Sequence, residues 1–302
     1  MIPPRSHSRL AAVAPGAGSL PAKTGYAFRC VDPLGGKVAE VTIEGKLLWD
    51  SKWDQPRDCW VMPDGNTFFC HAGGALEMLD DGRILWEYKA ESGSDVRSCQ
   101  PLPTGRFLLL ENGPCRLVEV DTFGEVSKQV LLTPPPPSID VVEDRFRGVR
   151  RTSDGHYLVC RKLEREVEEL DANGKTLRRI PVAGDPHLAL RLPDGKLLVA
   201  LGEAHRLQEL DSAGKVFWEI GEHDIAGNPL RLVSGFQRLP NGNTIVCNYL
   251  GEEYAGKQPH LFEITRDKKL VWEFSDHVNF RTISQIELLG PKGEVLKERA
   301  LR

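Results

Sequence analysis

Six glutamates recur along this chain, each five residues ahead of a turn. They stand about 37–54 residues apart, and the matching turn position is glycine in five cases and lysine in the sixth. A unit repeated at this interval is typical of a solenoid or a propeller. A mark present in every unit predicts a scaffold role, not catalysis. The glutamates are Glu40, Glu77, Glu119, Glu169, Glu209 and Glu263, and the turn positions are Gly45, Gly82, Gly124, Gly174, Gly214 and Lys268.

One repeat shows the local structure of the unit. Short β-rich stretches at 57–62, 67–71, 75–79 and 83–88 are separated by a loop and two tight glycine turns. Glycine is suited to such turns because it adopts positive φ easily. Four antiparallel strands joined by hairpins form one propeller blade.

The whole chain predicts an all-β, six-bladed β-propeller with four-stranded antiparallel blades. Five blades are continuous, and the sixth combines three strands near the N-terminus with a first strand inside Arg281–Leu289. This one-plus-three closure removes two sheet edges. Residues 1–22 carry no repeat and are expected to be a leader or tail before a single domain, 23–302. The expected blades are 57–88, 96–131, 146–181, 186–220, 233–275, and 280–289 with 24–53.

Composition narrows the range of partners. The chain is 40% hydrophobic and 27% charged, with a net charge of −4, which is ordinary for a globular protein. No nucleic acid is therefore expected as a partner. No apolar run is long enough for a membrane span. We expect a periplasmic or secreted protein if the N-terminal segment is a signal peptide, and a cytoplasmic one if it is not.

The seven cysteines are expected to be buried thiols. Four of them fall five residues after an aligned glycine, in a slot that other repeats fill with leucine or alanine. Equivalent positions in different blades do not face one another, which disfavours disulfides. The four are Cys30, Cys70, Cys160 and Cys247.

Loop length distinguishes the two faces of the ring. The turns between the first and second strands and between the third and fourth strands are short and of the glycine type. All long segments are expected on the other face, including 133–144 with its four prolines, 221–233 and 249–260. Because recognition is usually carried by loops, this long-loop face is predicted to carry the function.

A ring of basic residues is predicted on that face. Eight residues before each first-turn glycine stands a residue at the mouth of the innermost strand. Clustered arginines repel at about 1.5–2 kcal/mol per pair at about 8–10 Å and an effective dielectric of about 20, so either internal carboxylates or an anionic ligand must offset them. Both options remain open. The ring is Arg57, Arg97, Arg147, His187 and Ser234, with Ser284 in the split blade; the acids nearby are Asp58, Asp95, Glu111 and Asp185.

Two further layers are expected near the ring. The residues two positions after those of the ring, on the same strands, are apolar. We interpret them as a hydrophobic plug below the basic ring. The last arginines of the basic strand 145–151 are expected to solvate its turn. The apolar set is Cys59, Cys99, Val149, Ala189, Phe236 and Ile286.

Other candidates come from the ends of the second strands and from the long loops. Histidines at this rim suit acid–base work or nucleophilic catalysis, and no pair has the spacing of a metal site. The ligand-binding candidates beyond the four basic residues of the ring are His71, Arg161, Asn248 and Arg281, and the catalytic candidates are His187, His71 and His223.

Three strings carry a family resemblance. They are Leu-Pro-Asn-Gly-Asn-Thr-Ile-Val from Leu239, Leu-Pro-Asp-Gly-Lys-Leu-Leu-Val from Leu192, and the segment from Glu209 through Trp218-Glu. They resemble the PQQ-like and arylsulfotransferase-like bacterial propellers. The resemblance covers about residues 24–289 and implies a periplasmic or secreted setting. For arylsulfotransferases it implies a channel histidine that carries sulfate, with His187, His71 and His223 as counterparts.

The functional hypothesis is a propeller that binds an anionic small molecule or a carbohydrate at the channel mouth. No cofactor and no metal is expected. One alternative is a sulfotransferase-like or hydrolytic enzyme that uses a channel histidine. The other is a scaffold that binds a protein partner on the long-loop face.

Overall fold

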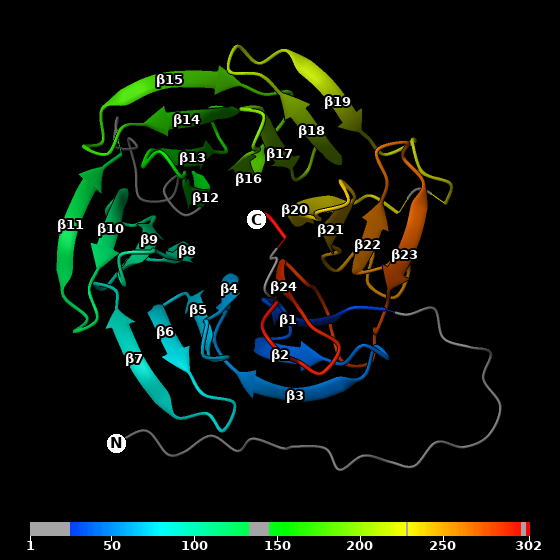
Figure 1. Cartoon of the computed structure of the whole chain (residues 1–302), viewed down its shortest axis with the longest axis horizontal. Coiled ribbons are helices and arrows are strands. Elements are labelled where there is room, and N and C mark those ends of the chain that lie inside the picture. The colour runs from blue at the N-terminus through cyan, green and yellow to red at the C-terminus, as the bar shows by residue number, and fades with distance from the viewer. Residues whose placement is uncertain (1–24, 133–144, 228, 297–299) are drawn as a thin grey trace.

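The computed structural model describes residues 25–132, 145–227, 229–296 and 300–302. Six four-stranded antiparallel sheets are arranged as blades around a central axis (Figure 1). The described residues form no helix, so none there can cross a membrane. The segment 133–144, expected to form a long loop with its four prolines, lies outside the described residues.

Each blade runs from an innermost strand at the axis to an outermost strand at the rim. The strands of the five continuous blades are β4 Asp58–Val61, β5 Thr67–His71, β6 Gly74–Met78 and β7 Ile84–Lys89; β8 Val96–Pro101, β9 Phe107–Glu111, β10 Arg116–Val120 and β11 Val126–Leu131; β12 Phe146–Arg151, β13 Tyr157–Arg161, β14 Glu166–Leu170 and β15 Thr176–Pro181; β16 Pro186–Arg191, β17 Leu197–Leu201, β18 Arg206–Leu210 and β19 Val216–Ile220; β20 Leu232–Arg238, β21 Thr244–Tyr249, β22 Leu261–Ile264 and β23 Leu270–Phe274.

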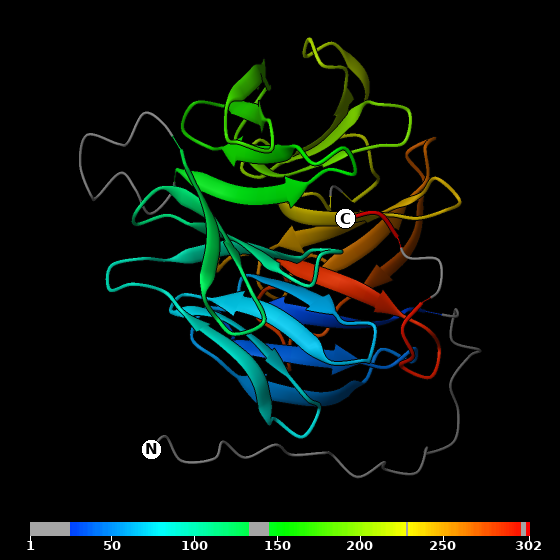
Figure 2. The same cartoon turned by 60° about the vertical axis from the view of Figure 1, so that its left-hand side comes forward.

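The sixth blade is split, and the predicted closure is confirmed. It contains β24 Gln285–Leu289 beside β1 Ala27–Asp32, β2 Lys37–Val41 and β3 Leu47–Lys52. β24 pairs antiparallel with β1, with Cys30 opposite Ile286. Figure 2 shows β24 among the N-terminal strands. The pairing covers the inner edge of β1, which would otherwise be open, and makes β24 the innermost strand of the blade.

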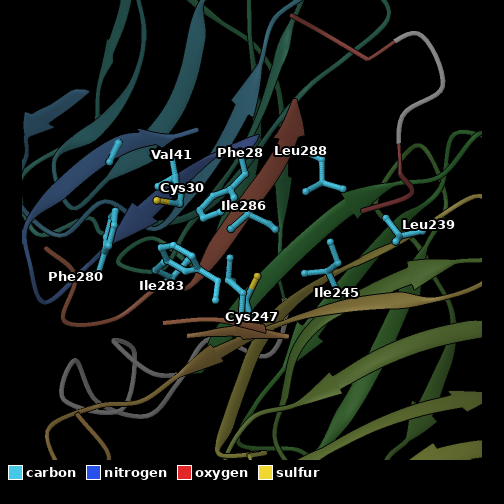
Figure 3. Packing of buried hydrophobic residues seen from close by; sticks show 13 residues of the cluster. Phe28, Cys30, Val41, Leu239, Ile245, Cys247, Phe280, Ile283, Ile286 and Leu288 are labelled. Atoms are coloured by element: carbon cyan, nitrogen blue, oxygen red, sulfur yellow. The ribbon is translucent and has the colours of Figure 1, made fainter. Parts of the chain in front are cut away.

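The junction of the split blade with its neighbour is packed by a continuous apolar cluster. Phe28 and Cys30 of β1 and Ile286 of β24 meet Cys247 of β21, and all four are fully buried (Figure 3). Phe28 also contacts Phe274 edge to face, with ring centroids 5.1 Å apart. Burial of these side chains stabilises the closed ring.

The repeated turn position requires positive φ. In the turns between third and fourth strands, the five glycines have φ between 76° and 86°. The sixth turn uses Lys268, whose φ is 62°. The same hydrogen bonds close these turns, for example from Gly82 N to Leu79 O at 2.9 Å and from Lys268 N to Thr265 O at 3.0 Å. Backbone geometry therefore explains the glycine repeat.

The repeated glutamate of the third strand connects neighbouring blades. Glu119 of β10 accepts hydrogen bonds from Arg151 and from the Tyr157 hydroxyl of the next blade, at 2.6 and 2.5 Å. Glu169 accepts one from Arg191 at 2.6 Å, and Glu209 is bonded to Arg238 at 2.5 Å in the same way.

The split blade and the blade before it in the ring use variants of this contact. Glu263 accepts a hydrogen bond from the Tyr26 hydroxyl at 2.8 Å. Glu40 binds Arg29 of its own blade, and Arg29 reaches Asp80 of the next blade at 2.8 Å. Glu77 differs, because the hydrogen bond that its carboxylate accepts comes from Asn66 of its own blade, at 2.8 Å. The scaffold role predicted for the glutamates fits these contacts.

The position four residues after the turn between the third and fourth strands provides a second connection between blades. Trp86 Nε1 donates to the Asp121 carbonyl at 2.9 Å, and Trp218 Nε1 donates to the Arg266 carbonyl at 2.8 Å. Lys128 occupies this position in another blade and donates to the Ala172 carbonyl. At these three positions tryptophan and lysine serve as equivalent donors to the turn of the next blade, whereas Trp49 of the split blade donates to Glu40 of its own blade at 3.2 Å.

The seven cysteines are all free and buried, as predicted. Burial raises the pKa of Cys160 and of Cys247 to about 12. Thiols in this state are protonated at neutral pH and are poor nucleophiles.

We expect replacement of Glu119 by alanine to lower the free energy of unfolding by about 3 kcal/mol, because it leaves the half-buried Arg151 and the buried Tyr157 without their shared acceptor. Urea unfolding of the purified protein measures this change. Glu125→Ala is the matched control, since Glu125 is exposed, and it should change stability by less than about 0.5 kcal/mol. Equal losses in both variants would contradict the role of the glutamate between blades.

Candidate functional site

A cavity of about 150 Å³ opens at the axis of the ring. Its lining contains one residue from the mouth of each innermost strand, so the structure brings all six predicted ring positions together. They are Arg57, Arg97, Arg147, His187, Ser234 and Ser284. The long connections start or end beside these positions. The cavity therefore lies on the predicted long-loop face.

Irregular strand pairing directs these side chains into the cavity. The register of β8 with β9 shifts between Val96 and Ser98, so Arg97 is an extra residue opposite the partner strand. The same shift occurs at Arg147, at His187 and at Ser234. Such β-bulges re-aim side chains locally.

Residues one position beyond the ring also face the axis. Asp58, Ser98 and Gln285 line the cavity, and Ser98 follows the bulge at Arg97. The apolar set that follows points between blades; Val149, for example, packs in a cluster with Leu110. The predicted hydrophobic plug is therefore wrong, because the extra residue shifts the inside–outside alternation by one position.

The floor of the cavity is instead polar. Arg150 Nη1 donates to Asp58 Oδ2 at 2.9 Å and to Ser98 Oγ at 3.1 Å. Arg150 is 1% exposed, so the expectation that it solvates the turn is wrong. The bulge at Arg147 rotates the strand and turns Arg150 toward the axis.

Arg57 and Arg97 share one carboxylate. Asp95 Oδ2 lies 2.5 Å from Arg97 Nε and 3.5 Å from Arg57 Nη2. Both arginine side chains are largely buried: Arg97 is 10% exposed and Arg57 is 17% exposed. Asp95 therefore lies between two guanidinium groups at the cavity and reduces their mutual repulsion.

His187 is held by Asp185. The distance from Nε2 to Asp185 Oδ2 is 3.1 Å. Burial, reinforced by the charge of Arg147, lowers the pKa of His187 despite the Asp185 contact. Burial alone would raise the pKa of Asp185, but hydrogen bonds from His187 and from the backbone N–H of Glu203 lower it to about 2. At neutral pH a neutral imidazole therefore faces the cavity beside an ionised carboxylate.

Two glycines make room for this pair. A Cβ on Gly202 would lie 2.3 Å from His187 Nε2, and one on Gly148 would lie 2.5 Å from the His187 carbonyl oxygen. Neither glycine has a positive φ. The reason for glycine at both positions is therefore space and not backbone conformation.

The remaining candidates lie outside the cavity lining. Arg161 is fully buried and binds Glu168 at 2.8 Å and Glu164 at 3.1 Å. Asn248 donates to the carbonyls of Pro229 and Pro259, at 2.7 and 2.9 Å. These contacts give both side chains an internal structural role.

The other three candidates are at the rim. Arg281 is 60% exposed and lies 3.5 Å from Glu252. His71 packs against Trp53, with ring centroids 5.4 Å apart, and His223 is exposed. The structure does not bring the three histidines His71, His187 and His223 together in the cavity, which only His187 lines.

Sequence reasoning missed part of the lining. Tyr249, Leu232 and Pro33 come from strand ends and a loop, at positions where other blades carry different residue types. Burial raises the pKa of Tyr249, against an opposite effect of Arg57, so its phenol is protonated and can donate a hydrogen bond. The only sequence signal is that Tyr249 directly precedes the longest loop between second and third strands.

One group of metal-type ligands occurs within the described ranges. Asp154, His156 and Glu169 have ligand atoms within 4.8 Å of one another. Glu169 already binds Arg178 and Arg191, each at 2.6 Å. Two guanidinium groups on the most buried acid oppose a cation at this point.

Comparison with known proteins identifies the fold. No family model matches the chain, and no curated protein matches it. A solved protein of unknown function from Bacteroides caccae is 28% identical, with a TM-score of 0.78 over 87% of this chain and 98% of that one. Two other similar solved structures are propellers whose sequences are much less identical to this chain.

Both of these have described functions. A catalytically inactive histidine-to-alanine variant of virginiamycin B lyase from Staphylococcus aureus, solved with quinupristin, is 12% identical, with a TM-score of 0.58 over 84% of this chain and 86% of that one. A chain of a nidogen–laminin complex is 10% identical, with a TM-score of 0.62 over 86% and 97%. At these identities the likeness shows the β-propeller fold alone.

We expect Gly202→Ala to displace the His187 ring and to break its contact with Asp185, because the added methyl group overlaps the imidazole. Stability should fall by about 1–3 kcal/mol, measured by thermal unfolding. Gly221→Ala is the control, since a Cβ there meets only Asp224 at 3.7 Å. A Gly202→Ala variant as stable as the control would show that the space beside His187 is not limiting.

Proposed function

We propose that the cavity binds a small organic anion. The observation that carries this proposal is the convergence of Arg57, Arg97 and Arg147, from three consecutive blades, on one small cavity. Guanidinium groups bind carboxylate, phosphate or sulfate oxygens through paired hydrogen bonds. Partial burial strengthens such contacts relative to those at an open surface.

The lining is polarised, which suits a ligand with one charged end. The basic residues belong to adjacent blades, with His187 next to Arg147 in the ring. The opposite side is uncharged and is formed by Ser234, Ser284, Leu232, Tyr249 and Pro33. An anionic head group would face the arginines, and an uncharged body would face Leu232 and Tyr249.

Size limits the ligand further. A cavity of about 150 Å³ holds roughly ten water molecules at about 15 Å³ of this kind of volume each. A carboxylate, phosphate or sulfate ester of about ten non-hydrogen atoms fits such a space. A long glycan could place only one terminal residue inside.

Charge reversal at Arg97 tests anion binding. Sulfate should raise the melting temperature of the wild-type protein above that seen in chloride of equal ionic strength, since a ligand that binds the folded state stabilises it. Arg97→Glu should abolish the sulfate effect. Arg281→Glu is the matched control on the same face and should keep it. A sulfate effect that persists in Arg97→Glu would refute the proposed site.

A second candidate function is catalysis at His187. The pair of His187 with Asp185 is the observation that favours it, because the carboxylate orients the ring and leaves Nδ1 for a ligand. A neutral imidazole beside arginines can act as a general base or as a nucleophile toward an anionic ester. The resemblance to arylsulfotransferase-like propellers also favours this second candidate function, because it implies a channel histidine that carries sulfate.

His187→Asn separates the two functions. If His187 is catalytic, turnover of a chromogenic aryl sulfate ester should fall at least ~100-fold, while sulfate stabilisation remains. Because burial lowers the pKa of His187 below its usual value of about 6.5, wild-type activity should be constant around neutral pH and fall only in acid. Activity unchanged by His187→Asn would exclude this candidate.

A further inference from the structure

The last described residues lie within the ring. Leu301 and Arg238 of β20 exchange two backbone hydrogen bonds, each of 2.8 Å. The following residue, Arg302, is only 6% exposed. Figure 1 places this end of the chain inside the circle of blades. Because Arg238 ends β20 next to a short turn, the segment enters from the face opposite the cavity mouth.

The guanidinium group of Arg302 occupies a complementary site. Nη2 donates to Asp58 Oδ1 at 2.9 Å, and Nη1 donates to Glu287 Oε2 at 3.1 Å. Cζ lies 4.0 Å from the centroid of the Trp60 ring. Two carboxylates and an aromatic face are a matched set for a planar cation. The side chains of Asp58 and Glu287 are 3% and 5% exposed.

Asp58 connects this site to the cavity. Its Oδ1 binds Arg302, its Oδ2 binds Arg150, and the residue lines the cavity. Arg302 therefore supplies a positive charge directly below the three arginines of the mouth. Without it, Asp58 would keep Arg150 as its partner, but the channel floor would lose one positive charge beneath a bound anion.

We propose that the channel floor is a guanidinium-binding site whose occupant, Arg302 of the same chain, sets the affinity of the cavity for anions. The binding site stands on its own geometry. The effect on affinity rests on the proposed function. A role of Arg302 in fold stability alone is the competing explanation, and the experiments below separate the two.

The first experiment tests the guanidinium site. Arg302→Ala should lower the melting temperature and leave a space between Asp58, Glu287 and Trp60. Millimolar guanidinium chloride should then raise the melting temperature of Arg302→Ala relative to equal ammonium chloride, and should not raise that of the wild-type protein, whose site is filled. Equal responses of the two proteins would overturn the site. If Arg302→Ala does not fold, its refolding yield with guanidinium against ammonium is the readout.

The second experiment tests the coupling with sulfate as the probe. Arg302→Met keeps side-chain bulk without charge and should weaken sulfate binding by about tenfold. Arg302→Lys keeps the charge and should retain near wild-type sulfate affinity. Arg83→Met is the control, because Arg83 is 73% exposed. Calorimetry or ligand-dependent unfolding measures each affinity.

The outcomes are distinct. Unchanged sulfate affinity in a destabilised Arg302→Met protein would assign Arg302 to stability alone and overturn the coupling. If the wild-type protein binds no sulfate, phosphate or small carboxylate, the anion site and the coupling both fail. The guanidinium response of Arg302→Ala would still decide whether the channel floor is a cation site.

Discussion

The buried carboxylate between neighbouring blades is the interaction on which the rest of this molecule depends. A propeller blade contacts mainly its two neighbours, so its position is set by the contacts across those two boundaries. Glu119, Glu169 and Glu209 each accept a hydrogen bond from an arginine of the following blade, and Glu119 also accepts one from a tyrosine hydroxyl. A partly unpaired buried charge costs several kcal/mol, so each glutamate requires its partner blade to be in register. Apolar packing supplies most of the free energy, and these contacts fix how the blades are rotated against one another.

Correct rotation of the blades matters most at the axis, where six innermost strands converge. In the strands with β-bulges at Arg97, Arg147 and His187, two consecutive residues line the cavity. An uninterrupted strand would alternate and would present polar residues at every second position only. The bulges therefore allow a basic mouth and a polar floor to be stacked directly on each other. This arrangement requires compensation, which Asp95 provides at the mouth and Asp58 at the floor.

The repeat register explains why so much could be predicted from sequence. The turn glycines and the glutamates mark every blade, and counting from them placed Arg57, Arg97, Arg147 and His187 around one opening. The same count is wrong one step deeper, because a bulge adds a residue without a fixed sequence mark. In the four bulged strands the residue after the ring position is Ser, Gly, Leu or Gly. Tyr249 ends a repeat strand but has no equivalent tyrosine in the other blades, and Arg302 lies outside the repeat; only the folded chain shows that both approach the axis. The burial of Arg150 could not be foreseen because its partner Asp58 is 92 positions away.

The strand order of the split blade has a consequence for synthesis. β1, β2 and β3 leave the ribosome first, but their innermost partner β24 begins at Gln285. The N-terminal three strands therefore wait with an exposed edge while five complete blades emerge. Loop closure over some 250 residues is slow, and open edges during that interval favour misassembly. Termination before Gln285 would remove β24. The ring of the nascent chain would then stay open, and chaperones or proteases could bind the exposed edge of β1.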